Sequence, residues 1–320
     1  MNTKFVKIQS VYKVIAFIFA VLYGFFTVAT LERLFTLDSG DVNSLVDFFD
    51  ANMQTDAIET YGIAGDGLFR LIIIFLGNFF GAEPKTVLSI IAFLTSSITF
   101  LIFSTASIKS KTSFINFAPL FLIVFLTPMV TNLYASGIRS GISFTLLMAA
   151  FVYFRGITRY ALFGLSSLIH LSMLPILALY ILFHTINKIK IRSVVFIPLT
   201  MLLVTSFSIA AFNFFFKINI ILSAQSFYYN FMIFYLALLL TFINRKAITN
   251  IYGFLAIGMI YVYLFGLVFE ISFIRYVGNS IILYLFFLIR RGGTGAIHIF
   301  TLGYIPFFVM GVFFAFANFA

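Results

Sequence analysis

The sequence predicts an all-α fold, namely a polytopic transmembrane helical bundle with about 9 to 11 membrane segments and one long acidic external loop. The chain is 62% hydrophobic and only 9% charged, whereas a soluble domain is roughly 25% charged. Apolar runs of about 20 residues recur along its length, as a bilayer about 30 Å thick requires. They lack the polar–apolar alternation of barrel strands, so we expect helices. We expect residues 1–320 to form a single integral membrane domain.

The first predicted span covers residues 14–31. Lys4, Lys7 and Lys13 precede it, which gives the segment the charge pattern of a signal peptide. Its apolar core is long, however, and no small-x-small cleavage site follows closely, so we interpret it as an uncleaved span. The three lysines place the N-terminus in the cytoplasm.

Residues 32–66 form the predicted external loop. Eight of the ten acidic residues lie here: Glu32, Asp38, Asp41, Asp47, Asp50, Asp56, Glu59 and Asp66. Within the loop, residues 42–53 carry apolar side chains at helical spacing. This pattern favours a helix that lies on the membrane surface or over the protein.

The remaining apolar segments follow in order. Residues 68–81 are too short for a full span and favour a re-entrant or interfacial segment. In the span 113–133, Pro119 and Pro128 predict kinks, and the apolar segment 160–183 contains His170 and Pro175. A polar–aromatic loop is expected at 217–229. The other predicted spans are 86–108, 138–154, 194–216, 230–243, 252–269, 276–289 and 297–319.

Basic residues near the span ends distinguish two topologies, because cytoplasmic loops are enriched in lysine and arginine. If 68–81 does not cross and 160–183 returns to its side of entry, 14 of the 20 basic residues are cytoplasmic. If both segments cross, 11 of the 20 are. The first model is favoured. Both models place the acidic loop, Arg70 and Arg275 outside, but only the first places Arg139 there.

The composition argues against several classes of function. The formal net charge is +10, yet the basic residues are scattered as pairs at loop ends, which indicates topology signals and not nucleic-acid binding. The chain has no cysteine, and His170, His184 and His298 lie far apart without HxxH or HExxH spacing. We therefore predict no metal site and no cofactor.

Arg70, Arg139 and Arg275 each lie at the end of an apolar run, and in the favoured topology all three face the outer leaflet. Arginine binds phosphate through a planar fork of donors and stays charged when partly buried. The three residues are therefore candidates for holding a lipid-linked phosphate or diphosphate. Snorkelling to lipid headgroups is the alternative. Asp66, four residues before Arg70, fits a helix cap with an ion pair.

Arg139 has the strongest polar surroundings of the three. On a helix, Ser136, Arg139, Ser140 and Ser143 fall within an arc of about 100°. Gly137 and Gly141 lie beside this arc and allow close helix packing. We expect the face to line a cavity, with packing alone as the alternative.

His170 is an ionisable residue inside an apolar segment, which suggests function. On a continuous helix it shares a face with Ser166 and Ser167. It is a candidate general base or hydrogen-bond donor. A hydrogen-bonded structural histidine is the alternative.

Residues 134–183 resemble the EpsG-like family of membrane polysaccharide polymerases, relatives of the Wzy-type O-antigen polymerases. The resemblance rests on Arg139 followed by small and apolar residues, a span, the basic pair Arg155 and Arg159, and then His170 before Leu-Ser. Two flanking segments also resemble the family: 65–77, a glycine-containing start of an early apolar segment, and 273–285, with Arg275 and Tyr276 as an Arg-aromatic motif. Ser140 stands where members commonly carry a polar residue such as Gln.

The resemblance implies a polymerase that transfers a glycan chain from undecaprenyl diphosphate to the next lipid-linked repeat, at the outer leaflet of the bacterial inner membrane. Residues 134–183 would form the core of the active site. Arg139, His170 and Arg275 would be catalytic, without a metal. The expected partners are the lipid-linked oligosaccharide, the bilayer and a chain-length regulator protein. The expected substrate-binding residues are Arg70, Ser136, Ser140, Ser143, Asp41, Asp66 and Tyr276.

Further roles and three other classes stay open. Asp41 or another loop aspartate is an alternative base, and Phe227, Tyr228 and Tyr229 are candidates for stacking on sugars. The same arginines would also suit a flippase or transporter for the lipid-linked glycan, although no inverted repeat is visible. A membrane sugar acyltransferase is the second alternative, but the early histidine of such families is absent. A structural membrane partner without catalysis is the third.

Overall fold

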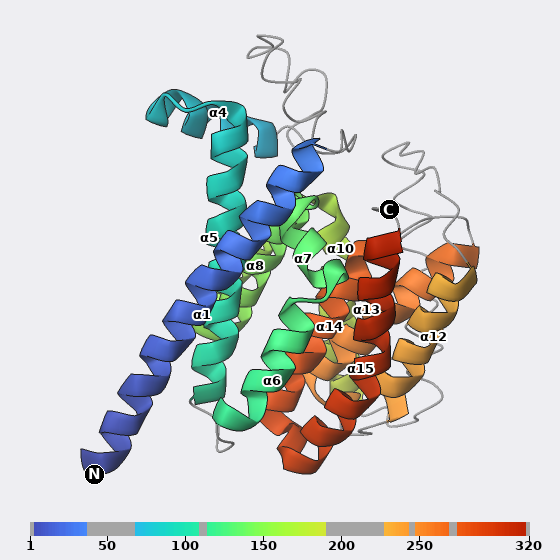
Figure 1. The fold of residues 1–320 in the computed structure, drawn as a ribbon. Coiled ribbons are helices and arrows are strands. Elements are labelled where there is room, and N and C mark those ends of the chain that lie inside the picture. The colour runs from blue at the N-terminus through green and yellow to red at the C-terminus, as the bar shows by residue number, and fades with distance from the viewer. Residues whose placement is uncertain are drawn as a thin grey trace. The chain divides into compact units, whose positions relative to one another are not determined.

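The computed structural model describes residues 3–36, 68–108, 114–189, 227–242, 247–268 and 274–317. Every regular element in these ranges is a helix, which confirms the all-α prediction (Figure 1). Most of the predicted acidic loop and the predicted span 194–216 lie outside the described residues. The described chain divides into two compact units: Met1–Lys109 with Thr131–Met173, and Ser110–Val130 with Leu174–Ala320. We call them unit 1 and unit 2.

Unit 1 is built around two long helices that pack along each other, α1 (Thr3–Thr36) and α5 (Pro84–Ile108). Gly24 of α1 lies directly against the side chains of Ser97 and Phe93 of α5. Ser97 Oγ also donates a hydrogen bond of 3.0 Å to the carbonyl of Ala20. The two backbones approach closely because a small residue faces the neighbouring helix, as is common in membranes.

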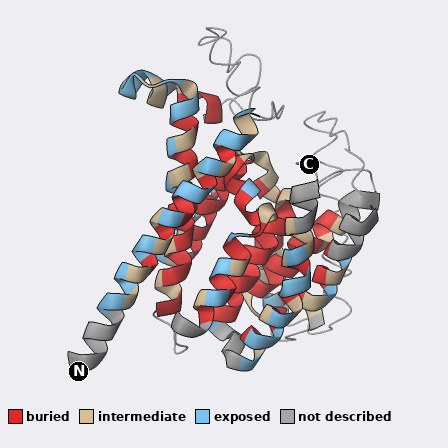
Figure 2. Ribbon diagram, in the orientation of Figure 1, coloured by how far each residue is buried: buried red, intermediate tan, exposed pale blue. Residues whose placement is uncertain are grey.

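The helix α4 (Leu68–Phe80) is short and strongly two-sided. Phe69 and Ile73 are fully buried, whereas Phe75, Phe79 and Phe80 are 62–71% exposed. Figure 1 shows α4 lying across the end of α5, and Figure 2 shows the exposed face along it. Its 13 residues fall short of the roughly 20 that cross a bilayer.

The other helices of unit 1 are α8 (Ile138–Tyr153), α9 (Gly156–Ile169), the 3₁₀ turn η2 (Leu171–Met173) and the end of α7 (Pro128–Ala135). The helix α8 packs on α5, where the hydroxyls of Thr99 and Thr145 lie 2.8 Å apart. It also packs along α9. Unit 1 therefore surrounds α5 and α8 with α1, α4 and α9.

Unit 2 has α14 (Ile274–Phe287) as its buried helix, since every residue from Tyr276 to Ile289 is buried (Figure 2). Ser280 Oγ donates to the Ala256 carbonyl of α13 at 2.6 Å, and the hydroxyls of Thr127 and Tyr304 lie 2.9 Å apart. The other elements of the unit are α6 (Phe114–Phe125), α10 (Leu174–Ile189), α12 (Phe227–Phe242), α13 (Ile251–Val268), the π turn η4 (Leu288–Gly292) and α15 (Gly293–Ala317).

Four described helices are long and apolar enough to cross a membrane: Ser10–Thr36, Pro84–Ile108, Leu171–Lys188 and Gly295–Val312. A fifth span results if the consecutive helices Phe117–Phe125 and Pro128–Ala135 count together. Shorter apolar helices occupy Leu68–Phe80, Ile138–Tyr153 and Ile251–Leu264. The chain is thus a multi-pass helical membrane protein.

The segment 160–183 is broken at His170, since α9 ends at Ile169 and the turn η2 follows. The structure corrects one predicted boundary. Phe227, Tyr228 and Tyr229 were predicted in a loop but form the first turn of α12. By contrast, the helix is interrupted just before Pro128, as predicted, while Pro119 lies within α6.

Candidate functional site

One apolar cluster of unit 1 joins six helices, and we call it the α4 cluster. Its members come from α1, α4, α5, α7, α8 and α9, and they pack together where α4 meets the other helices. The buried residues are Leu31, Phe69, Ile73, Val87, Leu88, Ile91, Ala92, Ala135, Ile138 and Ile169. Burial of this much apolar surface from distant parts of the chain fixes the positions of the residues next to it.

Four predicted site residues directly follow members of the α4 cluster in the chain. Arg70 follows Phe69, Ser136 follows Ala135, Arg139 follows Ile138, and His170 follows Ile169. Arg70 is only 8% exposed, and the other three are half-buried. The structure therefore gathers Arg70, Arg139 and His170, which are separated by up to 100 positions in sequence, around the same packed centre.

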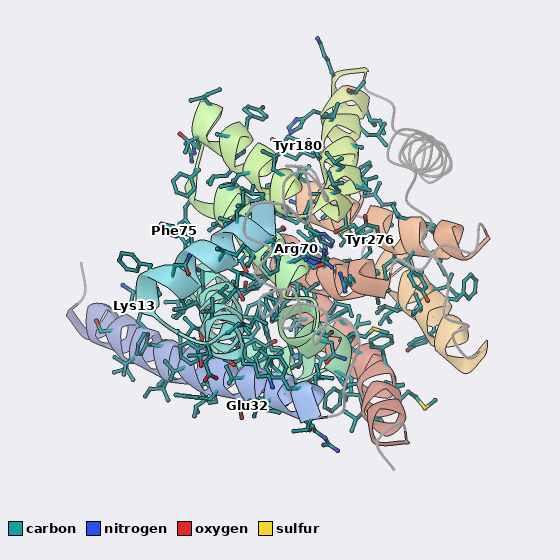
Figure 3. The ribbon with its side chains drawn as sticks, turned by 90° about the horizontal axis from the view of Figure 1, so that it is seen from above. Lys13, Glu32, Arg70, Phe75, Tyr180 and Tyr276 are labelled. Atoms are coloured by element: carbon teal, nitrogen blue, oxygen red, sulfur yellow. The ribbon has the colours of Figure 1, made fainter. Side chains whose placement is uncertain are left out.

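Arg70 lies at the inner end of α4. Seen from above in Figure 3, its side chain is on the part of α4 near the other helices of unit 1, and Phe75 lies farther out. An arginine buried to this degree beside Phe69 and Ile73 is unusual for a side chain that merely snorkels, because a snorkelling guanidinium reaches water or headgroups.

The turn between α7 and α8 positions Arg139. The carbonyl oxygen of Asn132 accepts three hydrogen bonds, from the N–H of Ser136 at 3.2 Å, the N–H of Gly137 at 2.8 Å and the hydroxyl of Ser136 at 3.0 Å. Ser136 therefore belongs to the turn and not to α8, so the predicted single helical face with Arg139 was wrong for Ser136. Gly141 lies so close to Leu133 and Tyr134 that a Cβ there would meet the carbonyl of Leu133 at 3.0 Å.

Arg139 and Ser140 occupy the first turn of α8. The residue before the helix is Gly137, which has no side chain with which to cap that turn. The N-terminus of a helix carries a partial positive charge, so a cation in the first turn is unfavourable by itself. The same arrangement becomes favourable when an anion lies against both the arginine and the helix end.

A hydrogen bond sets the register between α8 and α9. Ser166 Oγ donates to the carbonyl of Ser143 at 2.7 Å, and both residues are buried. Only Phe154 and Arg155 connect the two helices, which consequently run antiparallel. One turn onward from Ser166 is His170, and one turn back from Ser143 is Arg139. The register thus places Arg139 and His170 at the same height along the axis of the antiparallel α8–α9 pair.

His170 terminates α9. Its backbone is extended (φ −150°, ψ 110°), its N–H donates to the Ser166 carbonyl at 3.1 Å, and its own carbonyl accepts from Met173 at 3.0 Å. The predicted shared helical face of His170 with Ser166 and Ser167 was therefore wrong, because the helix ends one residue earlier. The break directs the chain away from the helix axis at the level of Arg139.

Ser140 and Ser143 are fully buried on α8, as expected for an inward face. Ser143 Oγ has no hydrogen-bond partner within the part of the chain that the structure describes. A serine in a helix commonly donates to the carbonyl four residues earlier, which here is that of Arg139. The unused hydroxyl lies one turn below Arg139 and adds a polar group to the same site.

The other predicted residues lie elsewhere. Arg275 and Tyr276 are in the first turn of α14 in unit 2, with Arg275 half-buried and Tyr276 buried. Asp41 and Asp66 lie outside the described residues. Arg159 of the predicted basic pair contacts the end of α8, where its Nε donates to the Phe154 carbonyl at 3.0 Å. Such a contact stabilises the negative end of a helix and explains Arg159 structurally.

Across the described ranges, no three His, Asp or Glu side chains lie close enough to hold a metal ion. Comparison with known proteins gave no relative: no family model, no curated protein and no solved structure matches the chain.

Proposed function

We propose that this protein polymerises lipid-linked oligosaccharide repeat units. A glycan chain would leave undecaprenyl diphosphate and join the next lipid-linked repeat at the outer leaflet of the bacterial inner membrane, with the protein's N-terminus in the cytoplasm. This proposal takes up the resemblance of residues 134–183 to EpsG-like and Wzy-type polymerases.

The observation that supports it best is the register of α8 and α9. Arg139 and His170 lie at the same level, next to the cluster that also holds the buried Arg70. A diphosphate leaving group needs fixed positive charge where its negative charge develops. Two arginines and the uncapped start of α8 supply that charge within one unit, in surroundings of low polarity where it acts most strongly.

Each residue then has a defined role. The acceptor hydroxyl loses its proton to His170 while its oxygen forms a bond to the anomeric carbon, and the bond from that carbon to the diphosphate oxygen breaks. Arg139, with Arg70 beside it, stabilises the departing diphosphate, and Arg275 stays a sequence-based candidate. Ser136, Ser140, Ser143 and Tyr276 are candidates for hydrogen bonds to substrate. Asp41 and Asp66 remain candidates from the acidic loop.

The test compares Arg139→Ala with Arg155→Ala in cells whose surface glycan is separated on a gel. Arg155 is exposed in the link between α8 and α9 and is the matched control. Loss of one transition-state donor typically lowers a rate by about 10²–10³-fold, so Arg139→Ala should leave single capped repeats, while Arg155→Ala should give the normal ladder. A normal ladder from Arg139→Ala contradicts the site. Deletion of the gene separates the classes, because a flippase defect leaves no capped repeats at all.

A further inference from the structure

Asn279 is a buried polar residue of unit 2 that the proposed mechanism leaves unused. It is 0% exposed on α14, and neither its Nδ2 nor its Oδ1 has a hydrogen-bond partner among the residues that the structure describes. The next residue, Ser280, is equally buried, but its hydroxyl has a partner, since it donates a hydrogen bond to the Ala256 carbonyl at 2.6 Å.

An amide without partners in an apolar interior is strongly unfavourable, and few buried polar groups in folded proteins stay unsatisfied. In a membrane protein the penalty is harder to avoid, because the surrounding hydrocarbon offers no water. A polar side chain that carries such a penalty is typically part of a binding site or transport path. The amide of Asn279 therefore indicates a polar group that binds there.

The packing of α14 shows which face holds the amide. At Gly278 a Cβ would meet the Met129 carbonyl at 3.0 Å, so this face contacts the start of α7, while Ser280 contacts α13. Asn279 points between these two contacts. At about 100° per residue, Arg275 and Tyr276 fall on the same face within an arc of about 100°. Figure 3 labels Tyr276, which lies in the first turn of α14.

Polarity along that face decreases inward. Arg275 is half-buried, Asn279 one turn deeper is fully buried, and Ile282 and Leu283 beyond it are buried and apolar. A ligand with a charged end at Arg275 and an uncharged polar part at Asn279 matches this order. Cβ atoms one helical turn apart are about 5–6 Å from each other, a spacing suited to the phosphate of a sugar phosphate and a substituent on the same sugar ring.

We propose that the Asn279 carboxamide binds the hydroxyl or acetamido substituent of the sugar whose diphosphate contacts Arg275. This inference rests on the proposed function, since it assigns a sugar subsite within unit 2 to a lipid-linked substrate of that reaction. A carboxamide both donates and accepts hydrogen bonds, as do a pair of neighbouring hydroxyls and an acetamido group. A site built on such bonds discriminates against a ligand that lacks them.

The experiment measures binding to the purified full chain in nanodiscs with two probes, geranyl diphosphate and the same lipid diphosphate carrying one N-acetylglucosamine. The unmodified protein should bind the sugar-bearing probe about tenfold more tightly, the gain expected from one or two hydrogen bonds. Asn279→Leu should bind both probes equally and should unfold at the same or a higher temperature, because leucine removes an unsatisfied amide while keeping the number and branching of the side-chain heavy atoms. Asn279→Ala serves as a second variant, and Ser280→Ala is the control that keeps the preference.

Each outcome decides the inference. A retained sugar preference in Asn279→Leu and Asn279→Ala overturns it while leaving the polymerase proposal intact. A marked loss of thermal stability in Asn279→Leu also overturns it, since the amide would then have a structural partner. Failure of the unmodified protein to bind either probe overturns both proposals together. Equal binding of the two probes by the variants, with stability kept, supports the sugar subsite.

Discussion

Ser166 Oγ lies 2.7 Å from the carbonyl oxygen of Ser143, and this hydrogen bond links α9 to α8 one turn away from both His170 and Arg139. Two half-buried candidate side chains from different helices thereby lie at the same height along the α8–α9 pair. The contact is local and can be removed without touching either group.

Removal of the Ser166 hydroxyl should weaken function more than stability. Ser166→Ala loses one buried hydrogen bond, about 1 kcal/mol of unfolding free energy, and it loosens the register that aligns His170 with Arg139. We expect shorter glycan chains on a gel and a small decrease in thermal stability in detergent. Ser167→Ala is the matched control, since Ser167 is also buried but its hydroxyl makes no hydrogen bond among the described residues. Equal chain lengths for the two variants would contradict the alignment.

A second pair of variants tests the packing of unit 1. Gly24→Val inserts a branched side chain where a Cβ already meets Ser97 and Phe93, so α1 must move away from α5. Overpacking of this kind typically lowers the unfolding free energy by about 1–3 kcal/mol. Gly164 on α9 has no atom within 4 Å of an added Cβ, and Gly164→Ala should instead stabilise the helix by about 0.5–1 kcal/mol. Thermal unfolding followed by circular dichroism measures both, and changes of the same sign would be inconsistent with this packing.

The hydroxyl contact between α5 and α8 predicts a measurable coupling. Thr99 and Thr145 lie 2.8 Å apart at their Oγ1 atoms, both buried. Replacing each by valine singly and together isolates the pair, because valine keeps the shape of threonine. Interhelical hydrogen bonds in membranes average about 0.6 kcal/mol in such cycles, and we expect a value of that size from equilibrium unfolding. Strict additivity of the two substitutions would show that the contact contributes no stability.

The membrane topology can be tested directly because the chain contains no cysteine. Lys85, exposed at the start of α5, is predicted to face outward, and the exposed Arg155 is predicted to face the cytoplasm. In intact cells a membrane-impermeant maleimide should therefore label Lys85→Cys, and it should label Arg155→Cys only after permeabilisation. The reverse pattern would favour the alternative in which both 68–81 and 160–183 cross the membrane.

The helices were predictable because backbone N–H and C=O groups in hydrocarbon must form hydrogen bonds within the chain, so long apolar runs form helices. The span at α5 followed from that rule, and the break before Pro128 followed from the chemistry of proline. The break at His170 was missed because neither glycine nor proline marks it. It is held by tertiary packing around Ile169 and by the hydrogen bond from Ser166 to α8.

The site was only partly predictable for the same reason. Charge inside apolar runs identified Arg70, Arg139 and His170, but their common level depends on the register of α8 and α9, which is a contact between distant positions. Asn279 had a visible signal, a carboxamide within the apolar run 273–285. Its full burial, and the lack of a partner for its amide among the described residues, only became evident with the packing of α14.

The threefold hydrogen bonding of the Asn132 carbonyl has a thermodynamic consequence for whatever anion approaches Arg139. A loop that becomes ordered only on binding loses backbone entropy at that moment, about 1–2 kcal/mol per residue. Here Ser136 and Gly137 are already fixed by hydrogen bonds of 2.8–3.2 Å. Their backbone entropy is therefore lost when the protein folds and not when the ligand binds. The first turn of α8 is preorganised, and affinity at this position is set by the contacts that the ligand makes.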